Sequence, residues 1–195
     1  MLTISISDPE LVRLLSGGGV GVLPTDTLYG LVCRAEDQEA VTRLYALKHR
    51  ESKPGTVIAA NVAQLKVLGL VDESLARAIP QWPGPLSILI AATEQSSYIT
   101  QGLPELACRV ISGPAELITL LERVGPLLTS SANQPGEPVA ATVDQAMGSF
   151  DDNIDFYVDG GDFSDALPST LIKLGPDGSE ILRQGAGKID TKEVP

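Results

Sequence analysis

Short apolar runs separated by helix-like segments give the chain its pattern. The runs at residues 20–23, 86–91 and 127–128 are almost continuously apolar, which is typical of strands covered on both faces. Apolar side chains at helical spacing lie between such runs, for example Val41, Leu44 and Leu47. This alternation of strands and helices predicts an α/β fold.

Capping residues mark where the predicted helices begin. A side chain that can accept backbone N–H bonds precedes each of four helical segments: Asp8, Asp37, Asn61 and Asp72. Residues 169–174 and 180–183 predict a C-terminal hairpin around a turn at residues 176–178. The sequence contains no internal repeat and no linker-like stretch, so one core is the simplest arrangement of its 195 residues.

A hydroxyl-rich turn follows the first apolar strand. Pro24 lacks an N–H group and should end regular pairing there, which leaves Thr25 and Thr27 at the strand end. Ligands of open α/β sheets bind outside the carboxyl ends of strands, so both threonines are candidate ligand groups. The alternative is that their hydroxyls satisfy the backbone of their own turn, as Thr and Asp side chains often do.

A second polar segment, at residues 129–133, also follows a strand and carries four hydrogen-bonding side chains. If it lies beside the turn after Pro24, the two form one polar crevice. Arg109 is unusual because it lies within an apolar strand at residues 107–111. A buried arginine needs a partner: either an acidic side chain of the protein or the carboxylate of a ligand held by the planar guanidinium.

Cations gather where the helix at residues 38–47 ends, at Lys48, Arg50 and Lys53. The chain has only 14 Lys and Arg against 25 Asp and Glu, for a formal net charge of -11, so the cluster stands out. A helix C-terminus favours cations by itself, which is the structural explanation for the cluster. The acidic balance argues against a protein that holds nucleic acid mainly through phosphate contacts.

Several common catalytic patterns are missing. The glycine-rich stretches at residues 17–19 and 185–188 fit neither a dinucleotide-binding loop nor a Walker loop. There is no G-x-S-x-G or H-E-x-x-H motif, and His49 is the single histidine. We therefore expect catalysis by positioning and charge stabilisation, without a protein nucleophile and without a metal held by protein ligands.

The cysteines and the N-terminus bear on where the protein works. Cys33 and Cys108 form no C-x-x-C pair, so neither a disulfide framework nor a structural zinc site is expected. The N-terminus lacks a signal-peptide pattern, and no apolar run is long enough to span a bilayer. These features predict a cytoplasmic protein that does not bind membranes.

Motifs spread along nearly the whole chain complete this picture. They are Pro24-Thr25-Asp26-Thr27-Leu28-Tyr29-Gly30 with Lys48-His49-Arg50, Trp82-Pro83-Gly84-Pro85, Ala107-Cys108-Arg109-Val110, Thr129-Ser130-Ser131-Ala132-Asn133, Pro168-Ser169-Thr170 and Ile181-Leu182-Arg183. In this order and spacing, the set resembles the YrdC-like threonylcarbamoyl-AMP synthases. The resemblance implies one YrdC-like domain over residues 1–195, in the family's short form, with a twisted mixed sheet, flanking helices and an open polar crevice.

The resemblance also implies a reaction, in which L-threonine, bicarbonate and ATP give threonylcarbamoyl-AMP and pyrophosphate for the threonylcarbamoyladenosine modification of tRNA. Magnesium would accompany ATP, and tRNA threonylcarbamoyl transferase proteins would be the downstream partners. The threonine-binding residues carried over are Thr25, Arg109, Thr129 and Ser169. The ATP-binding residues are Lys48, Arg50, Ser52, Ser131, Asn133 and Arg183, with Lys48 and Arg50 also expected to stabilise phosphate charge during catalysis.

Some positions depart from the family's pattern, namely Glu51, Gly55, Cys108, Ile111, Pro135 and Gln184. None of these departures removes a charged site residue. Two other functions stay open on the sequence: a YrdC-like module that binds RNA or a nucleotide without turnover, in translation or ribosome maturation, and a related carbamoyltransferase. The net charge disfavours direct binding of RNA, and the presence of both Lys48 and Arg50 favours binding of a nucleotide.

Overall fold

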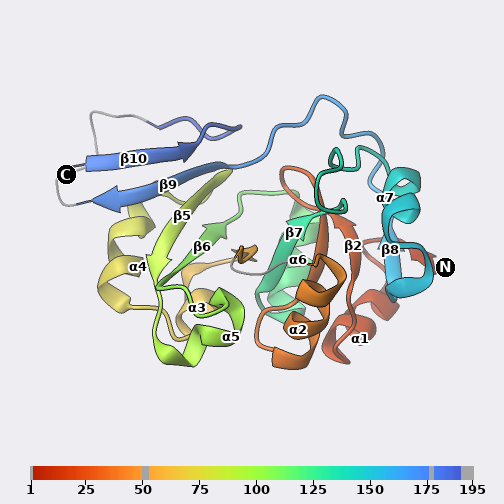
Figure 1. Ribbon diagram of the computed structural model, residues 1–195, viewed down its shortest axis with the longest axis horizontal. Helices are drawn as coiled ribbons and strands as arrows, with labels where there is room; N and C mark the ends of the chain where they lie inside the picture. The colour runs from red at the N-terminus through yellow and green to blue at the C-terminus, as the bar shows by residue number, and fades with distance from the viewer. Residues whose placement is uncertain (1, 50–52, 176–177, 190–195) are drawn as a thin grey trace.

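A ten-stranded mixed sheet forms the centre of the computed structural model, which describes residues 2–49, 53–175 and 178–189 (Figure 1). Strand β3 is antiparallel to β2 and β7, whereas β4 runs parallel to β6. The predicted α/β fold with a mixed sheet is thus confirmed. In order across the sheet, the strands are β1 (Thr3–Ile4), β8 (Phe156–Val158), β2 (Gly21–Pro24), β3 (Tyr29–Arg34), β7 (Leu127–Ser131), β4 (Thr56–Ala59), β6 (Glu105–Val110), β5 (Leu86–Ala91), β9 (Thr170–Gly175) and β10 (Gly178–Arg183).

Helices cover both faces of the sheet. Leu31 of β3 packs in one hydrophobic core with Leu44 of α2, whereas Val32 packs in a second core with Leu11 of α1 and Leu117 of α6. Side chains alternate along a strand, so the two cores lie on opposite faces. Within the described ranges, no helix is long and apolar enough to cross a bilayer. The helices are α1 (Pro9–Ser16), α2 (Gln38–Leu47), α3 (Val62–Lys66), α4 (Asp72–Ala78), α5 (Ser97–Thr100), α6 (Ala115–Val124) and α7 (Val143–Phe150).

Local capping explains where most of these helices begin. Asp8, Asp37 and Asn61 each accept a backbone N–H from the first turn of the following helix, at 2.8 to 3.2 Å, as predicted. The prediction for Asp72 is wrong, because α4 begins at Asp72 itself and its N-cap, Val71, makes no side-chain cap bond. The helix dipole favours a carboxylate anywhere in the first turn, so an acidic residue at a helix start need not be the cap.

Strand register turns a row of side chains toward the α1 and α6 face. Thr56 of β4 pairs with Ala107 of β6 and with Thr129 of β7, and Thr129 pairs with Val32 of β3. Paired residues of neighbouring strands point to the same side of a sheet. Because Val32 belongs to the core of α1 and α6, the whole row lies on that face.

A long segment carries the chain from β8 across the sheet to β9, along the top of Figure 1. Tyr29 holds its start: the phenol accepts the N–H of Gly160 at 2.7 Å and donates to the carbonyl of Gly161 at 3.0 Å. Phe163 packs against the Tyr29 ring, with the ring centroids 5.0 Å apart. The segment ends at Ser169, next to β9, and so brings this hydroxyl to the half of the sheet that holds β5 and β6.

Cys33 and Cys108 are free and buried on strands β3 and β6. Burial raises the pKa of both thiols. A protonated, inaccessible thiol is unreactive, so both cysteines act as small apolar packing groups.

Gly21 allows β2 to approach β8 closely. A Cβ at this position would lie 2.5 Å from the ring and the carbonyl oxygen of Phe156. Gly21→Ala is therefore expected to lower the free energy of unfolding by about 1–3 kcal/mol, the usual cost of overpacking. Gly148 is the matched control, because it lies exposed in α7 and an added Cβ would meet nothing within 4 Å.

Gly148→Ala should raise the free energy of unfolding by about 0.5–1 kcal/mol through helix propensity. Urea unfolding of the two variants measures both effects. If Gly21→Ala is as stable as the parent chain, the close approach of β2 and β8 is wrong.

Candidate functional site

A cavity of about 400 Å³ opens where the two predicted polar segments meet. Thr25 and Thr27 line it from the turn after Pro24, and Thr129 and Ser131 line it from the end of β7. The segments lie side by side because β3 and β7 are antiparallel neighbours, so the start of one strand adjoins the end of the other. The structure therefore contains the polar crevice that the sequence predicts.

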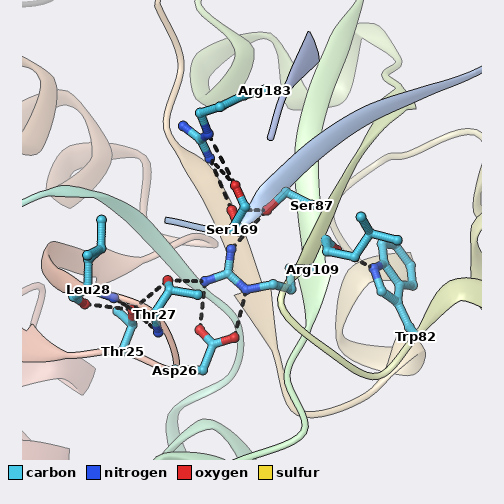
Figure 2. Close-up of polar contacts among 10 residues, drawn as sticks. Thr25, Asp26, Thr27, Leu28, Trp82, Ser87, Arg109, Ser169 and Arg183 are labelled. Atoms are coloured by element: carbon cyan, nitrogen blue, oxygen red, sulfur yellow. Dashed lines mark hydrogen bonds and ion pairs between the residues drawn. The ribbon is translucent and has the colours of Figure 1, made fainter. Parts of the chain in front are cut away.

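The buried guanidinium of Arg109 lies at the centre of this site (Figure 2). Its Nε and Nη2 donate to the two carboxylate oxygens of Asp26 at 3.0 and 2.7 Å, and the exposed fractions of the two side chains are 3% and 8%. Nη2 also donates to Thr27 Oγ1 at 3.3 Å, and Nη1 donates to Ser87 Oγ at 2.8 Å. Of the two partners left open by the sequence, the acidic side chain is the one observed.

Two serines connect Arg109 to a second arginine. The hydroxyl oxygens of Ser87 and Ser169 are 2.9 Å apart, and Nη2 of Arg183 donates to the Ser169 hydroxyl at 3.1 Å. Burial lowers the pKa of Arg183, and the positive charge of Arg109 lowers it further. Arginine nevertheless remains protonated in proteins. Asp26 balances one of the two positive charges, so this end of the cavity attracts a further anion.

The hydroxyl of Thr25 is engaged by its own turn, although the residue lines the cavity. It donates to the carbonyl of Leu28 at 2.7 Å and accepts the N–H groups of Thr27 and Leu28 at 3.2 Å each. For Thr25, the turn-satisfying alternative is therefore what the structure contains. Thr27 instead accepts from Arg109, which ties the turn to the buried ion pair.

Two glycines fix the position of Thr129. A Cβ on Gly30 would lie 2.3 Å from Thr129 Oγ1, and a Cβ on Gly55 would lie 2.5 Å from the Thr129 carbonyl oxygen. A side chain at either position would displace Thr129 from the cavity wall. The departure from the family pattern at Gly55 thus has a local reason, which is the close passage of the β7 backbone.

Lys48 does not face the cavity as expected of a phosphate-binding cation. It follows α2 as the C-cap, is 1% exposed, and its ammonium donates to the Ser131 carbonyl at 2.8 Å. It also donates to the carbonyl of Asn133 and, at 3.1 Å, to the Asn133 side-chain oxygen. These bonds connect the polar segment after β7 to the end of α2. Lys48 therefore fixes the position of this segment from outside the cavity.

The predicted site residues fall into three groups. Those that line the cavity are Thr25, Arg109, Thr129, Ser131, Ser169 and Arg183. Lys48 and Asn133 lie next to one another but do not line it. Arg50 and Ser52 lie outside the described residues. So does Glu51, one of the departures from the family's pattern.

Two residues of the hydrogen-bonded network were missed by the site predictions, Asp26 and Ser87. Each carried a signal: Asp26 is the acidic residue between two candidate threonines, and Ser87 is the one polar residue in the apolar run at residues 86–91. Neither signal indicates which residue the side chain bonds, because Arg109 is distant from both in the sequence. Trp82, to the right of Arg109 in Figure 2, donates to the Leu86 carbonyl at 2.9 Å and packs against the core.

Comparison with known proteins identifies the family. The model of the Sua5/YciO/YrdC family, whose description is "Telomere recombination", matches residues 13–185. The chain belongs to this family. The membership confirms the resemblance carried by the motifs, and the YrdC-like fold is confirmed with it.

Two curated relatives of the chain are named threonylcarbamoyl-AMP synthase. The Coxiella burnetii protein is 35% identical over 162 residues, which cover 81% of this chain and 86% of the relative. The Bacillus subtilis protein is 30% identical over 190 residues, which cover 93% of this chain and 55% of the relative.

A solved structure shares the fold over most of the chain. The crystal structure of P. abyssi Sua5 complexed with L-threonine has a TM-score of 0.80 and 28% sequence identity, and the match covers 94% of this chain and 57% of that one. The present chain thus spans a little over half of the P. abyssi and B. subtilis proteins, but most of the C. burnetii protein.

Removing Asp26 would leave Arg109 buried without its charge partner. Asp26→Ala is expected to lower the free energy of unfolding by about 3–5 kcal/mol, because an uncompensated buried charge is very costly. Arg13→Ala is the control: it breaks the exposed ion pair with Glu10, and such pairs add little to stability. Urea unfolding compares the variants, and a small loss in both contradicts the assigned role of the buried pair.

Proposed function

We propose that this chain synthesises L-threonylcarbamoyladenylate from L-threonine, bicarbonate and ATP, with release of pyrophosphate. The observation that carries the proposal is the donor-rich cavity wall formed by Arg109, Ser169 and Arg183, in a chain that aligns with most of a C. burnetii threonylcarbamoyl-AMP synthase. The threonine complex of P. abyssi Sua5 supports an amino acid as one of the ligands. The product serves the threonylcarbamoyladenosine modification of tRNA.

Threonine binds, in this proposal, with its carboxylate toward Arg109 and Ser169. Asp26 neutralises only one of the two positive charges of Arg109 and Arg183. The remaining positive charge favours a carboxylate beside them. Thr129 forms the adjoining wall and is held in place by Gly30. Thr25 shapes the wall without a free hydroxyl, since its own turn uses that group.

The nucleotide binds beside threonine, with its phosphates toward Arg183 and the polar segment after β7. Ser131 lies on the cavity wall, where its hydroxyl donates to the Asn133 side-chain oxygen at 2.7 Å and Lys48 holds its backbone carbonyl. Arg50 and Ser52 supply further phosphate contacts in this proposal. Such an arrangement stabilises phosphate charge by fixed dipoles and cations, which need no reorganisation during the reaction.

The reactants carry their own nucleophiles. The threonine amine attacks bicarbonate to form a carbamate with loss of water. A carbamate oxygen then attacks the α-phosphorus of ATP, a new P–O bond forms, and the bond to pyrophosphate breaks. The side chains of this chain therefore act by holding two reactants in line, a contribution that alone can supply about 7–11 kcal/mol of the barrier reduction.

Magnesium enters the proposal together with ATP. In the part of the chain that the structure describes, no three His, Cys, Asp or Glu side chains gather as a metal site would. A site without such a cluster suits an ion that is held mainly by phosphates and water, which is the usual mode for magnesium. When bound, magnesium neutralises charge on the departing pyrophosphate.

The proposal also places the protein in a cell and among partners. We propose a cytoplasmic location, in keeping with two free, buried cysteines. The net charge of -11 disfavours direct binding of tRNA, so we propose that separate threonylcarbamoyl transferase proteins take up the adenylate.

Pyrophosphate release tests the reaction directly. The chain is incubated with ATP and magnesium, and threonine and bicarbonate are added singly and together. We expect release only with both, because each supplies part of the carbamate. Calorimetric binding of ATP without any release would refute the synthase and favour a nucleotide-binding module or a carbamoyltransferase.

Removal of magnesium gives a second test. Chelation with EDTA should abolish pyrophosphate release while leaving threonine binding unchanged, because the ion acts on the phosphates and not on the carboxylate subsite. Calorimetry with L-threonine, with and without EDTA, measures the second part. A loss of threonine binding on chelation would contradict this placement of the ion.

A further inference from the structure

Ser87 is a fully buried hydroxyl between the two arginines of the site. Along β5, Leu86, Ile88 and Ile90 belong to the hydrophobic core on one face of the sheet, whereas Leu89 lines the cavity. Ser87 alternates with the core residues and therefore lies on the same face as Leu89. It is not a cavity-lining residue, so it reaches the site only through its neighbours.

The hydrogen bonds of Ser87 fix the direction of its proton. Its oxygen accepts from Nη1 of Arg109 at 2.8 Å and lies 2.9 Å from the Ser169 oxygen. A buried hydroxyl left without an acceptor is costly, and Ser169 is its one acceptor among the residues described. Ser87 therefore donates to Ser169.

The same count of hydrogen-bond donors and acceptors assigns the proton of Ser169. Its oxygen accepts from Ser87 and from Nη2 of Arg183, which is 3.1 Å away. Both acceptor positions of the hydroxyl are then filled, and its own proton remains. Since Ser169 lines the cavity, this proton is available to a ligand.

Arg109 offers a matching donor. Of the five N–H groups of a guanidinium, those on Nε and Nη2 bond Asp26 and Thr27, and one on Nη1 bonds Ser87. The other N–H on Nη1 has no acceptor in the described segments. Nη1 and the Ser169 oxygen both lie within hydrogen-bond distance of Ser87, so two free donors adjoin one another.

We propose that Ser87 is a positioning residue for the threonine subsite, which it orients without touching the substrate. By donating to Ser169 and accepting from Arg109, it leaves one N–H and one O–H to meet the two oxygens of a carboxylate. The subsite then presents only donors, and it rejects a carboxamide, whose NH₂ group would face them. This inference rests on the proposed function, because it assumes that threonine is the ligand.

A double-mutant cycle measured by calorimetry with L-threonine tests the inference. Ser87→Ala is expected to weaken threonine binding about 10- to 100-fold, in the range for losing hydrogen bonds to a charged group. In a Ser169→Ala background, the same change should cost less than about threefold, because residues that act through one another are not additive. L-threoninamide, measured in parallel, should show little change between Ser87→Ala and the parent chain.

Two further variants separate positioning from folding. Ser96→Ala is the matched control, since Ser96 is also fully buried but donates to backbone carbonyls of Gly69 and Thr93, which do not line the cavity. It should lower stability and leave threonine affinity unchanged. Ser87→Cys replaces Ser87→Ala if the latter does not fold, because a thiol fills the space but donates weakly, so the same loss is expected.

Equal losses in the parent and Ser169→Ala backgrounds, or unchanged threonine affinity in Ser87→Ala, would overturn the positioning role while leaving the proposed function intact. A parent chain that neither binds threonine nor releases pyrophosphate would overturn the proposed function, and the inference with it. A similar loss of affinity in Ser96→Ala would show that Ser87 acts through stability alone.

Discussion

The buried ion pair between Arg109 and Asp26 holds the two walls of the cavity together. Arg109 projects from β6 and Asp26 lies in the turn between β2 and β3, with strands β7 and β4 between them in the sheet. Two charges removed from water are stable only when geometry and further hydrogen bonds are good. The bonds from Arg109 to Thr27 and Ser87 supply these, so the turn is fixed over the sheet.

Local charge and overall charge have opposite signs in this protein. The net charge of -11 repels an anionic ligand at long range, whereas the cavity holds two arginines that are linked through serines. Repulsion between Arg109 and Arg183 contributes to the lowered pKa of Arg183, and a bound anion would relieve it. Anion binding therefore depends on a few desolvated donors, which act strongly because the surrounding dielectric is low.

Residues that look alike in the sequence have different structural duties. The hydroxyl of Thr25 donates a hydrogen bond within its own turn, whereas the hydroxyl of Thr27 accepts a hydrogen bond from Arg109. Lys48 is enclosed and holds the backbone after β7, while Arg183 reaches the cavity wall. One set of groups thus holds the backbone around the cavity, and another lines the cavity. This division means that the donors of the candidate site are already ordered without a ligand.

The sequence alone determined the features that depend on neighbours along the chain. Apolar runs, the caps at Asp8 and Asp37 and the polar strand ends follow from local hydrogen bonding and periodicity, and the ordered motifs identified the family. Only the tertiary structure decided which partner Arg109 takes and that Ser87 links it to Ser169. Burial and pairing across the sheet join residues that are distant in sequence, and no local pattern encodes those distances.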